Sequence, residues 1–191
     1  MKLYHYSVDS FHGGQQLIND FKNSYQFAEP YLLALRESRE LFKAVFFATM
    51  YMSREVKALG LRKYENYQKD AAEGIFEYVR ETEFSQEPSR LHCVYYCQSK
   101  EEAVEYAWND CLADGLFTKE QVILLEVEVE ESRIRCYDQS FFNLAEKAIG
   151  RNDFDAVFAC ARKYYASLKT DHPLTEIVSD GENHVIRTIA F

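Results

Sequence analysis

Apolar and polar residues alternate at the start of the chain and then repeat at helical spacing over a much longer stretch. Leu3, His5 and Ser7 fall on one face of an expected short strand, because successive side chains of a strand point to opposite sides. From about residue 15 to residue 79 the apolar residues recur every three or four positions, which predicts helices. The residues that show this spacing most clearly are Leu32, Leu35, Leu41, Phe42, Val45, Phe46 and Met50. Pro30 suits the first turn of the main helix.

A strand followed directly by a helix is expected in the middle of the chain. Residues 91–97 are rich in aromatic and β-branched side chains, which is typical of a strand. Ser99 and Glu102 have the spacing of a capping box, in which each side chain bonds a backbone N–H at the start of a helix. Tyr95 is therefore expected on the strand and Tyr106 on the helix that follows it.

The rest of the chain alternates between strands and helices. Residues 133–137 are expected to continue the strand before them or to form a hairpin with it. Asp180-Gly181 is a typical hairpin turn between the last two strands. The further elements that the pattern predicts are helices at about 64–79, 140–149 and 154–168 and strands at 122–130, 175–178 and 185–189.

These elements predict an α+β protein with helices packed around a mostly antiparallel sheet. We expect a single domain over residues 1–191, in which residues 15–80 form a long helical insertion after the first strand. The length of 191 residues is enough to bury a substantial core without disulfides or metal.

Composition narrows the cellular setting. No apolar run approaches the roughly 18 residues that a membrane helix needs, and the first residues lack the features of a signal peptide. The expectation is a cytoplasmic protein without membrane contact. The five cysteines are expected to be free thiols, and the pair Cys93 and Cys97 lacks the second Cys/His pair of a zinc site.

The net charge of −9 argues against a general nucleic-acid coat protein. The charge is uneven, however. Residues 31–80 carry nine Lys or Arg against seven Asp or Glu, whereas residues 81–191 carry eleven against twenty-one. The helical segment is therefore the natural place for a local nucleic-acid surface.

Three segments carry a resemblance to a known family. The motifs GxSxG, GxGxxG and HExxH and the phosphate-binding P-loop are all absent. His5 is followed two residues later by Ser7 in the first strand, Tyr95 and Tyr106 have ten residues between them, and Glu176 lies in a late strand. In this order the chain resembles the His-Tyr-Glu branch of the ADP-ribosyltransferase superfamily, which includes diphtheria-type toxins and poly(ADP-ribose) polymerases.

The segments 87–91 and 161–165 and the terminal strands also resemble a little-characterised bacterial family of that fold. The resemblance implies a split, mostly antiparallel sheet and NAD⁺ as co-substrate. It implies that His5 binds a ribose of NAD⁺ with Ser7 bonding nearby, that Tyr95 and Tyr106 hold nicotinamide, and that Glu176 is catalytic.

The chemistry of the reaction agrees with these residue types. Transfer from NAD⁺ breaks the bond between ribose and nicotinamide, and positive charge develops on the sugar. A carboxylate such as Glu176 stabilises that charge in the transition state. A flat nicotinamide ring suits stacking between two aromatic side chains, which Tyr95 and Tyr106 supply.

Several positions leave alternatives open. The family commonly has Gly directly after the first-strand His, where this chain has Tyr6, and Tyr96 competes with Tyr95 because the two face opposite sides of a strand. Arg90 is a candidate contact for an NAD⁺ phosphate, with a structural salt bridge as the alternative. Glu126, Glu128 and Glu130 alternate along one strand and are interpreted as an exposed acidic edge. Asp138 is a possible supporting residue.

The leading functional hypothesis is a mono-ADP-ribosyltransferase that moves ADP-ribose from NAD⁺ to a macromolecule, nucleic acid slightly favoured over protein. The resemblance implies a bacterial toxin of a toxin–antitoxin or antiviral system, with an antitoxin protein as a further partner. The alternative is a binding module on the same fold with degraded catalysis, which Tyr6 favours. RNA 2′-phosphate transfer ranks last, because only Arg90 and His92 offer the side chains that it uses.

Overall fold

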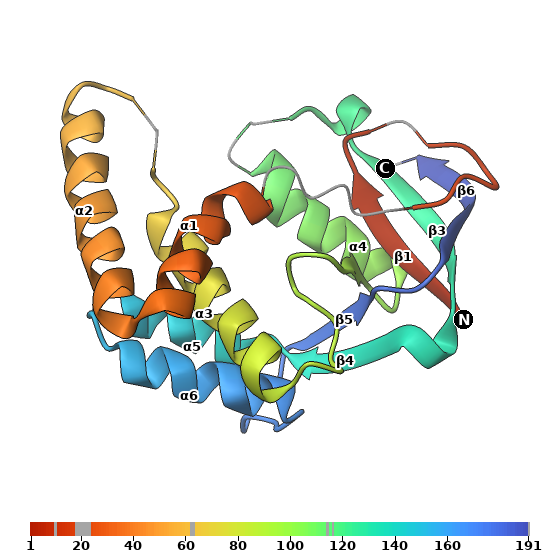
Figure 1. Cartoon of the computed structure of the whole chain (residues 1–191). Coiled ribbons are helices and arrows are strands. Elements are labelled where there is room, and N and C mark those ends of the chain that lie inside the picture. Colours follow the sequence, from red (N-terminus) through yellow and green to blue (C-terminus); the bar gives the residue numbers. More distant parts are fainter. Residues whose placement is uncertain (10, 18–23, 62–63, 114, 116, 191) are drawn as a thin grey trace. The chain divides into compact units, whose positions relative to one another are not determined.

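A computed structural model describes residues 1–9, 11–17, 24–61, 64–113, 115 and 117–190 of the chain. Figure 1 shows the α+β class that the sequence predicts, with six strands and six α-helices in this part of the chain. The chain divides into two compact units. The first comprises Met1–Asp20, His92–Cys136 and Glu176–Phe191, and the second comprises Phe21–Leu91 and Tyr137–Thr175. Among the described residues no helix is both long enough and apolar enough to cross a membrane.

The strands in the described part of the chain form two small antiparallel sheets. One has the order β1-β3-β6 and the other β2-β5-β4. The strands are β1 (Lys2–Ser7), β2 (Val94–Tyr96), β3 (Ile123–Val129), β4 (Ile134–Asp138), β5 (Thr175–Ser179) and β6 (Asn183–Ala190). A single bridge between Tyr4 and Cys97 links β1 to β2, through backbone hydrogen bonds of 3.0 and 2.8 Å. The strands therefore follow one another as β4-β5-β2-β1-β3-β6, with a split after one bridged pair.

The core of the first unit lies on both faces of the sheet β1-β3-β6. Alternate residues pack on one face with Val94, Tyr96 and Ile177 of the other sheet; they include Leu3, Leu125, Val127, Val129 and Val185. The intervening residues face α4 (Lys100–Ala107), where Ala103 packs against Leu124. This alternation explains why a continuous apolar run over β3 is buried on both sides.

The helix α4 begins at the predicted cap. The Ser99 hydroxyl accepts from the Glu102 N–H at 3.1 Å, and the Glu102 carboxylate accepts from the Gln98 N–H at 2.8 Å. A five-residue π-helix, Trp108–Leu112, continues the chain from its end. The remaining short turns are 3₁₀ helices at Lys119–Gln121 and Glu131–Arg133.

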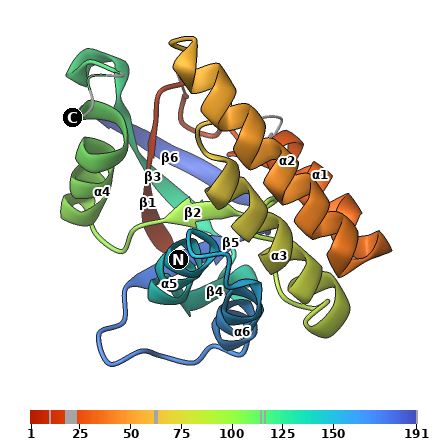
Figure 2. The ribbon, with the colours of Figure 1, turned by 90° about the vertical axis from the view of Figure 1, so that its left-hand side faces the viewer.

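The second unit is helical. Its helices are α1 (Ser24–Glu37), α2 (Arg39–Ala58), α3 (Tyr67–Glu83), α5 (Ser140–Ile149) and α6 (Phe154–Tyr165). Figures 1 and 2 show α1 beside α3 and α5 beside α6, and these are the closest packed pairs. Gly74 of α3 lets α1 approach, since a Cβ there would lie 2.8 Å from the Cβ of Tyr31 and 3.2 Å from the Ala28 carbonyl oxygen.

The helical insertion differs in detail from the prediction. Residues 18–23 and 62–63 of the expected segment 15–80 lie outside the described residues. Gln15–Leu17 are not helical, because the Val185 N–H bonds the Gln15 carbonyl and the Leu17 N–H bonds the Asn183 carbonyl. Pro30 stands inside α1 rather than in its first turn. It is exposed there, as is Gln26, whose carbonyl loses its helical donor and faces solvent instead.

The predicted terminal hairpin is wrong, because β5 and β6 belong to different sheets. A type I′ hairpin turn needs positive φ at both central residues, and neither Asp180 nor Gly181 has it. The turn is instead a corner that Arg133 holds through two hydrogen bonds, of 3.0 and 2.8 Å, to the Asp180 carboxylate. Gly181 is needed for close approach, since a Cβ would lie 2.7 Å from the Cβ of Arg133.

Two further interpretations fail for the same topological reason. Residues 133–137 neither continue β3 nor pair with it, because β4 joins the sheet of β5. Glu128 and Glu130 are exposed as predicted. The strand β3 is not a sheet edge, however, because it lies between β1 and β6. Glu126 is consequently buried at 5 % exposure and forms ion pairs with Lys2 and Arg187 on the two neighbouring strands.

Gly74→Ala is expected to lower the free energy of unfolding by about 1–3 kcal/mol, because the added methyl group must push α1 away from α3. Gly150→Ala is the matched control: its Cβ would meet nothing nearer than 3.5 Å, so the change should be neutral or slightly stabilising. Urea unfolding of the two variants measures both effects. Equal stability of both variants and the wild type would contradict this account of the α1–α3 contact.

Candidate active site

His5 reaches from β1 across the split to the backbone of β2. Its Nδ1 lies 2.8 Å from the carbonyl oxygen of Tyr95. A carbonyl oxygen only accepts, so Nδ1 carries the hydrogen. Burial lowers the pKa of His5, and the bond to Tyr95 opposes this only in part. The ring is therefore neutral at pH 7, and Nε2 presents a lone pair that can accept a hydrogen bond.

The register of β2 and β5 decides which tyrosine accompanies Glu176. Tyr96 pairs with Ile177 and points with it into the apolar core, where the Tyr96 ring meets His5 edge-on at 6.1 Å. Tyr95 pairs with Val178 and is half-buried on the opposite face. Because side chains alternate along β5, Glu176 shares the face of Val178 and hence of Tyr95. Tyr95 rather than Tyr96 therefore lies on the face of Glu176.

Tyr106 belongs to the same face. It lies in the last turn of α4 and packs against a cluster that contains Cys97. Cys97 is in strand phase with Tyr95, two residues earlier. The face that carries Tyr95 and Glu176 thus continues into the face covered by α4. His5 stands on the other face, at the point where β1 and β2 separate.

Tyr6 occupies the position directly after His5. Its ring lies parallel to the His5 ring, with 5.9 Å between centroids and an angle of 11°. It also packs against the cluster of Cys97, Ala103 and Leu124, to which Tyr106 contributes. The backbone N–H and C=O of Tyr4 point toward β2, so those of Tyr6 point to the same side of β1 by strand alternation. Tyr6 therefore contacts both His5 and the cluster to which Tyr106 contributes.

Ser7 ends β1 on the face of His5. Its hydroxyl oxygen accepts from the Asp9 N–H at 3.0 Å, which closes a local turn. A serine hydroxyl that accepts in this way still has its own hydrogen to donate. Ser7 can therefore bond a ligand beside His5 without losing the turn.

Arg90 belongs to the other unit. Its guanidinium donates to both oxygens of Glu73 at 3.1 Å and to the hydroxyl of Tyr164 at 3.0 Å, and it is buried at 6 % exposure. It also lies 4.2 Å above the ring of Phe142. The structure thus gives Arg90 the salt bridge that was the alternative interpretation. Its bond to Tyr164 joins the segments 87–91 and 161–165.

Asp138 is a residue whose importance sequence reasoning understated. Its fully buried carboxylate accepts hydrogen bonds from the N–H groups of Ser140, Thr170 and Leu174, and from the Thr170 hydroxyl, at 2.7–3.0 Å. Burial raises the pKa of Asp138, but the hydrogen bonds from Thr170 and Ser140 outweigh burial and hold it well below its ordinary value. These bonds fix the chain that leads into β5, and Glu176 follows Leu174 by two residues.

No group of three or more His, Cys, Asp and Glu side chains suited to a metal ion occurs within the described ranges. The side chains of the first unit instead offer an acceptor at His5, aromatic rings at Tyr95 and Tyr106 and a carboxylate at Glu176. His5 lies on the opposite face from Tyr95, Tyr106 and Glu176, so the structure does not bring the four onto one face. The two rings and the carboxylate suit a flat, positively charged ligand.

The family model described as protein of unknown function (DUF2441) matches residues 7–191. The chain belongs to this family. The match spans both units, including all the candidate residues except His5, which precedes it by two positions. No curated protein matches the chain.

Asp138→Asn is expected to lower the free energy of unfolding by roughly 3 kcal/mol at pH 7, because an amide cannot replace a carboxylate that accepts four hydrogen bonds. The pKa of Asp138 is depressed on folding, so its stabilisation is present above pH 3.8 and is lost as the pH falls below that value. The difference from wild type should therefore shrink in acid. Urea unfolding at pH 7 and below pH 3.8 measures this.

Asp171→Asn is the control, because it removes the same charge from an exposed position next to Thr170. It should change stability by less than about 0.5 kcal/mol. An Asp138→Asn protein that unfolds at the wild-type urea concentration at pH 7 would refute the role assigned to Asp138.

Proposed function

We propose that this protein transfers ADP-ribose from NAD⁺ to a macromolecular acceptor and that its first unit holds the NAD⁺. One observation carries the proposal: His5 bonds the backbone of Tyr95 where β1 and β2 separate. Tyr95, Tyr106 and Glu176, which the resemblance assigns to nicotinamide and to catalysis, lie together on the face opposite to that of His5. The split, mostly antiparallel arrangement and the helices after β1 agree with the fold that the resemblance implies.

His5 would bind a ribose of NAD⁺ as a hydrogen-bond acceptor. With Nδ1–H donated to Tyr95, the lone pair of Nε2 is the group left to receive a sugar hydroxyl. The lowered pKa of His5 keeps this lone pair available at pH 7. Ser7, on the same face, would add a hydroxyl donor beside it.

Tyr95 and Tyr106 would hold the nicotinamide ring, and Glu176 would act on the sugar attached to it. In the reaction the bond from C1′ of the ribose to the nicotinamide nitrogen breaks, and nicotinamide leaves with the electron pair. The acceptor nucleophile then bonds C1′ and releases its proton. The Glu176 carboxylate stabilises the positive charge on the ribose between these events, a contribution worth about 10²–10³ in rate.

The second candidate is a binding module on the same fold, and Tyr6 is the observation that favours it. Its ring lies along His5, at the position where the family commonly has Gly to let the backbone approach nicotinamide. In a binding module the side chains would hold a nucleotide or a partner protein without cleaving NAD⁺. Turnover separates the two candidates, because only the transferase releases nicotinamide.

Wild-type protein incubated with cell extract and NAD⁺ labelled in the adenylate part should transfer label to macromolecules. Glu176→Gln should lower the transfer at least about 100-fold, because it removes the charge but keeps the shape. Glu128→Gln, an exposed position on β3, is the control and should leave transfer unchanged. Digestion of the products with nuclease or protease then identifies the acceptor class.

Two results would count against the transferase. NAD⁺ that binds while neither wild type nor Glu176→Gln releases nicotinamide favours the binding module. Transfer that proceeds equally in wild type and Glu176→Gln removes Glu176 from the chemistry.

A further inference from the structure

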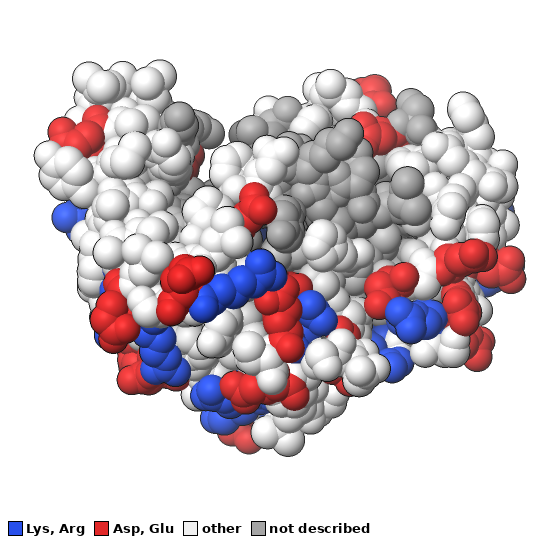
Figure 3. All heavy atoms as spheres, viewed as in Figure 1, with Lys and Arg blue, Asp and Glu red and all other residues white. Residues whose placement is uncertain are grey.

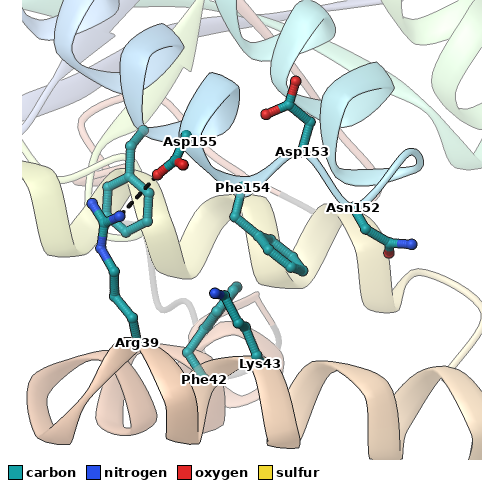
Figure 4. A pocket seen from close by; sticks show the side chains of 8 residues that line it. Arg39, Phe42, Lys43, Asn152, Asp153, Phe154 and Asp155 are labelled. Carbon is teal, nitrogen blue, oxygen red and sulfur yellow. Dashed lines mark hydrogen bonds and ion pairs between the residues drawn. The ribbon is translucent and has the colours of Figure 1, made fainter.

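The helical unit contains a pocket of about 180 Å³ between the start of α2 and the start of α6 (Figure 4). It is separate from the candidate active site, since all of its lining residues belong to the second unit. They are Arg39, Phe42, Lys43, Asn152, Asp153, Phe154, Asp155 and Phe158. At about 30 Å³ for each water of liquid volume, the pocket holds roughly six waters, which is room for one small ring system.

The floor of the pocket is aromatic. Phe42 and Phe158 are almost fully buried, and the half-buried Phe154 meets the Phe42 ring edge-to-face at 5.3 Å. Phe154 is thus the one of these three rings with accessible surface, and a flat ligand can pack its face or edge against it.

The walls carry opposite charges. Arg39 and Lys43 stand one helical turn apart on α2, whereas Asp153 and Asp155 stand at the start of α6. Arg39 lies 4.3 Å above the Phe158 ring and donates to Asp155 at 2.8 Å. Asp153 caps α6 by accepting from the Ala156 N–H at 3.1 Å.

The charged side chains of the walls keep unused hydrogen-bond donors and acceptors for a ligand. The Arg39–Asp155 pair uses one N–H of a guanidinium that has five and one oxygen of a carboxylate that has two. Its side chains are 51 % and 87 % exposed, so both are open to solvent. The pocket therefore offers cationic donors on one side and anionic acceptors on the other.

We propose that this pocket binds a guanine base. The base presents O6 and N7 as acceptors on one edge, and cationic donors such as Arg39 and Lys43 are its usual partners. Its N1–H and amino group are donors that a carboxylate such as Asp155 accepts. Adenine places an amino group where guanine presents O6, and uracil has no amino group for the carboxylates. The flat ring packs on Phe154 and fills the limited volume.

The charge of the walls also indicates which part of a nucleotide enters. The two acids and two bases of the pocket cancel, so a phosphate gains little inside it. Among the described residues drawn in Figure 3, basic and acidic side chains are interspersed. Recognition by the base rather than by phosphate follows from both observations.

The proposal does not depend on the proposed transferase activity, and its test needs no NAD⁺. Calorimetric titration of the whole protein with GMP, AMP and UMP should give binding of GMP at least about tenfold tighter than that of the other two. A single-stranded oligouridylate with one central guanosine, compared with plain oligouridylate, shows whether the base is taken from RNA or only from the free nucleotide. Stronger binding of either guanine source supports the proposal.

Lys43→Gln and Asp155→Asn should each weaken GMP binding about tenfold, and both change exposed side chains. Lys57→Gln, also exposed on α2 and outside the pocket, is the control and should bind as the wild type does. The proposal is overturned by equal affinity for GMP and AMP, by no binding of either guanine source, or by variants that bind as well as the control.

Discussion

The structure of the first unit depends on the fact that β1 and β2 pair at only one residue. The bridge between Tyr4 and Cys97 joins two three-stranded sheets, and beyond it the two strands separate. Continued antiparallel pairing would give the Tyr95 carbonyl the backbone N–H of Tyr6 as its donor. The ring takes the place of that pairing and bonds the Tyr95 carbonyl itself. The split thereby sets the tautomer of His5 and the strand phase of the tyrosines together.

Local chemistry was enough to predict many of the elements. The cap at Ser99 is evident from two side chains three positions apart, and it starts α4 where expected. Residues 140–149 coincide with α5 because their apolar spacing fits one buried helix face. The prediction for Pro30 was wrong because a proline is tolerated inside a helix when it lies on an exposed face. The carbonyl that loses its helical donor can then bond water.

Long-range pairing escaped the sequence because it depends on partners far along the chain. Asp180-Gly181 has the composition of a hairpin turn, but the bond to Arg133 makes it a corner between sheets. The isolated pattern of Glu126 predicts an exposed edge, whereas Lys2 and Arg187 surround it. Asp138 shows the same limit: its partners Thr170 and Leu174 are more than thirty positions away. The order of the candidate residues along the chain was evident from the sequence, but the sheet face on which each of them lies was not.

The central claim is that His5 is a neutral acceptor positioned at the split for a ribose hydroxyl. Nitrogen-15 NMR of the imidazole rings tests it most directly, with assignments from a His5→Gln sample. The account predicts that at pH 7 the His5 ring carries its hydrogen on Nδ1 alone, and that added NAD⁺ shifts Nε2 of His5 while leaving the exposed His172 unchanged. A doubly protonated ring, a hydrogen on Nε2, or no response of Nε2 to saturating NAD⁺ would contradict it.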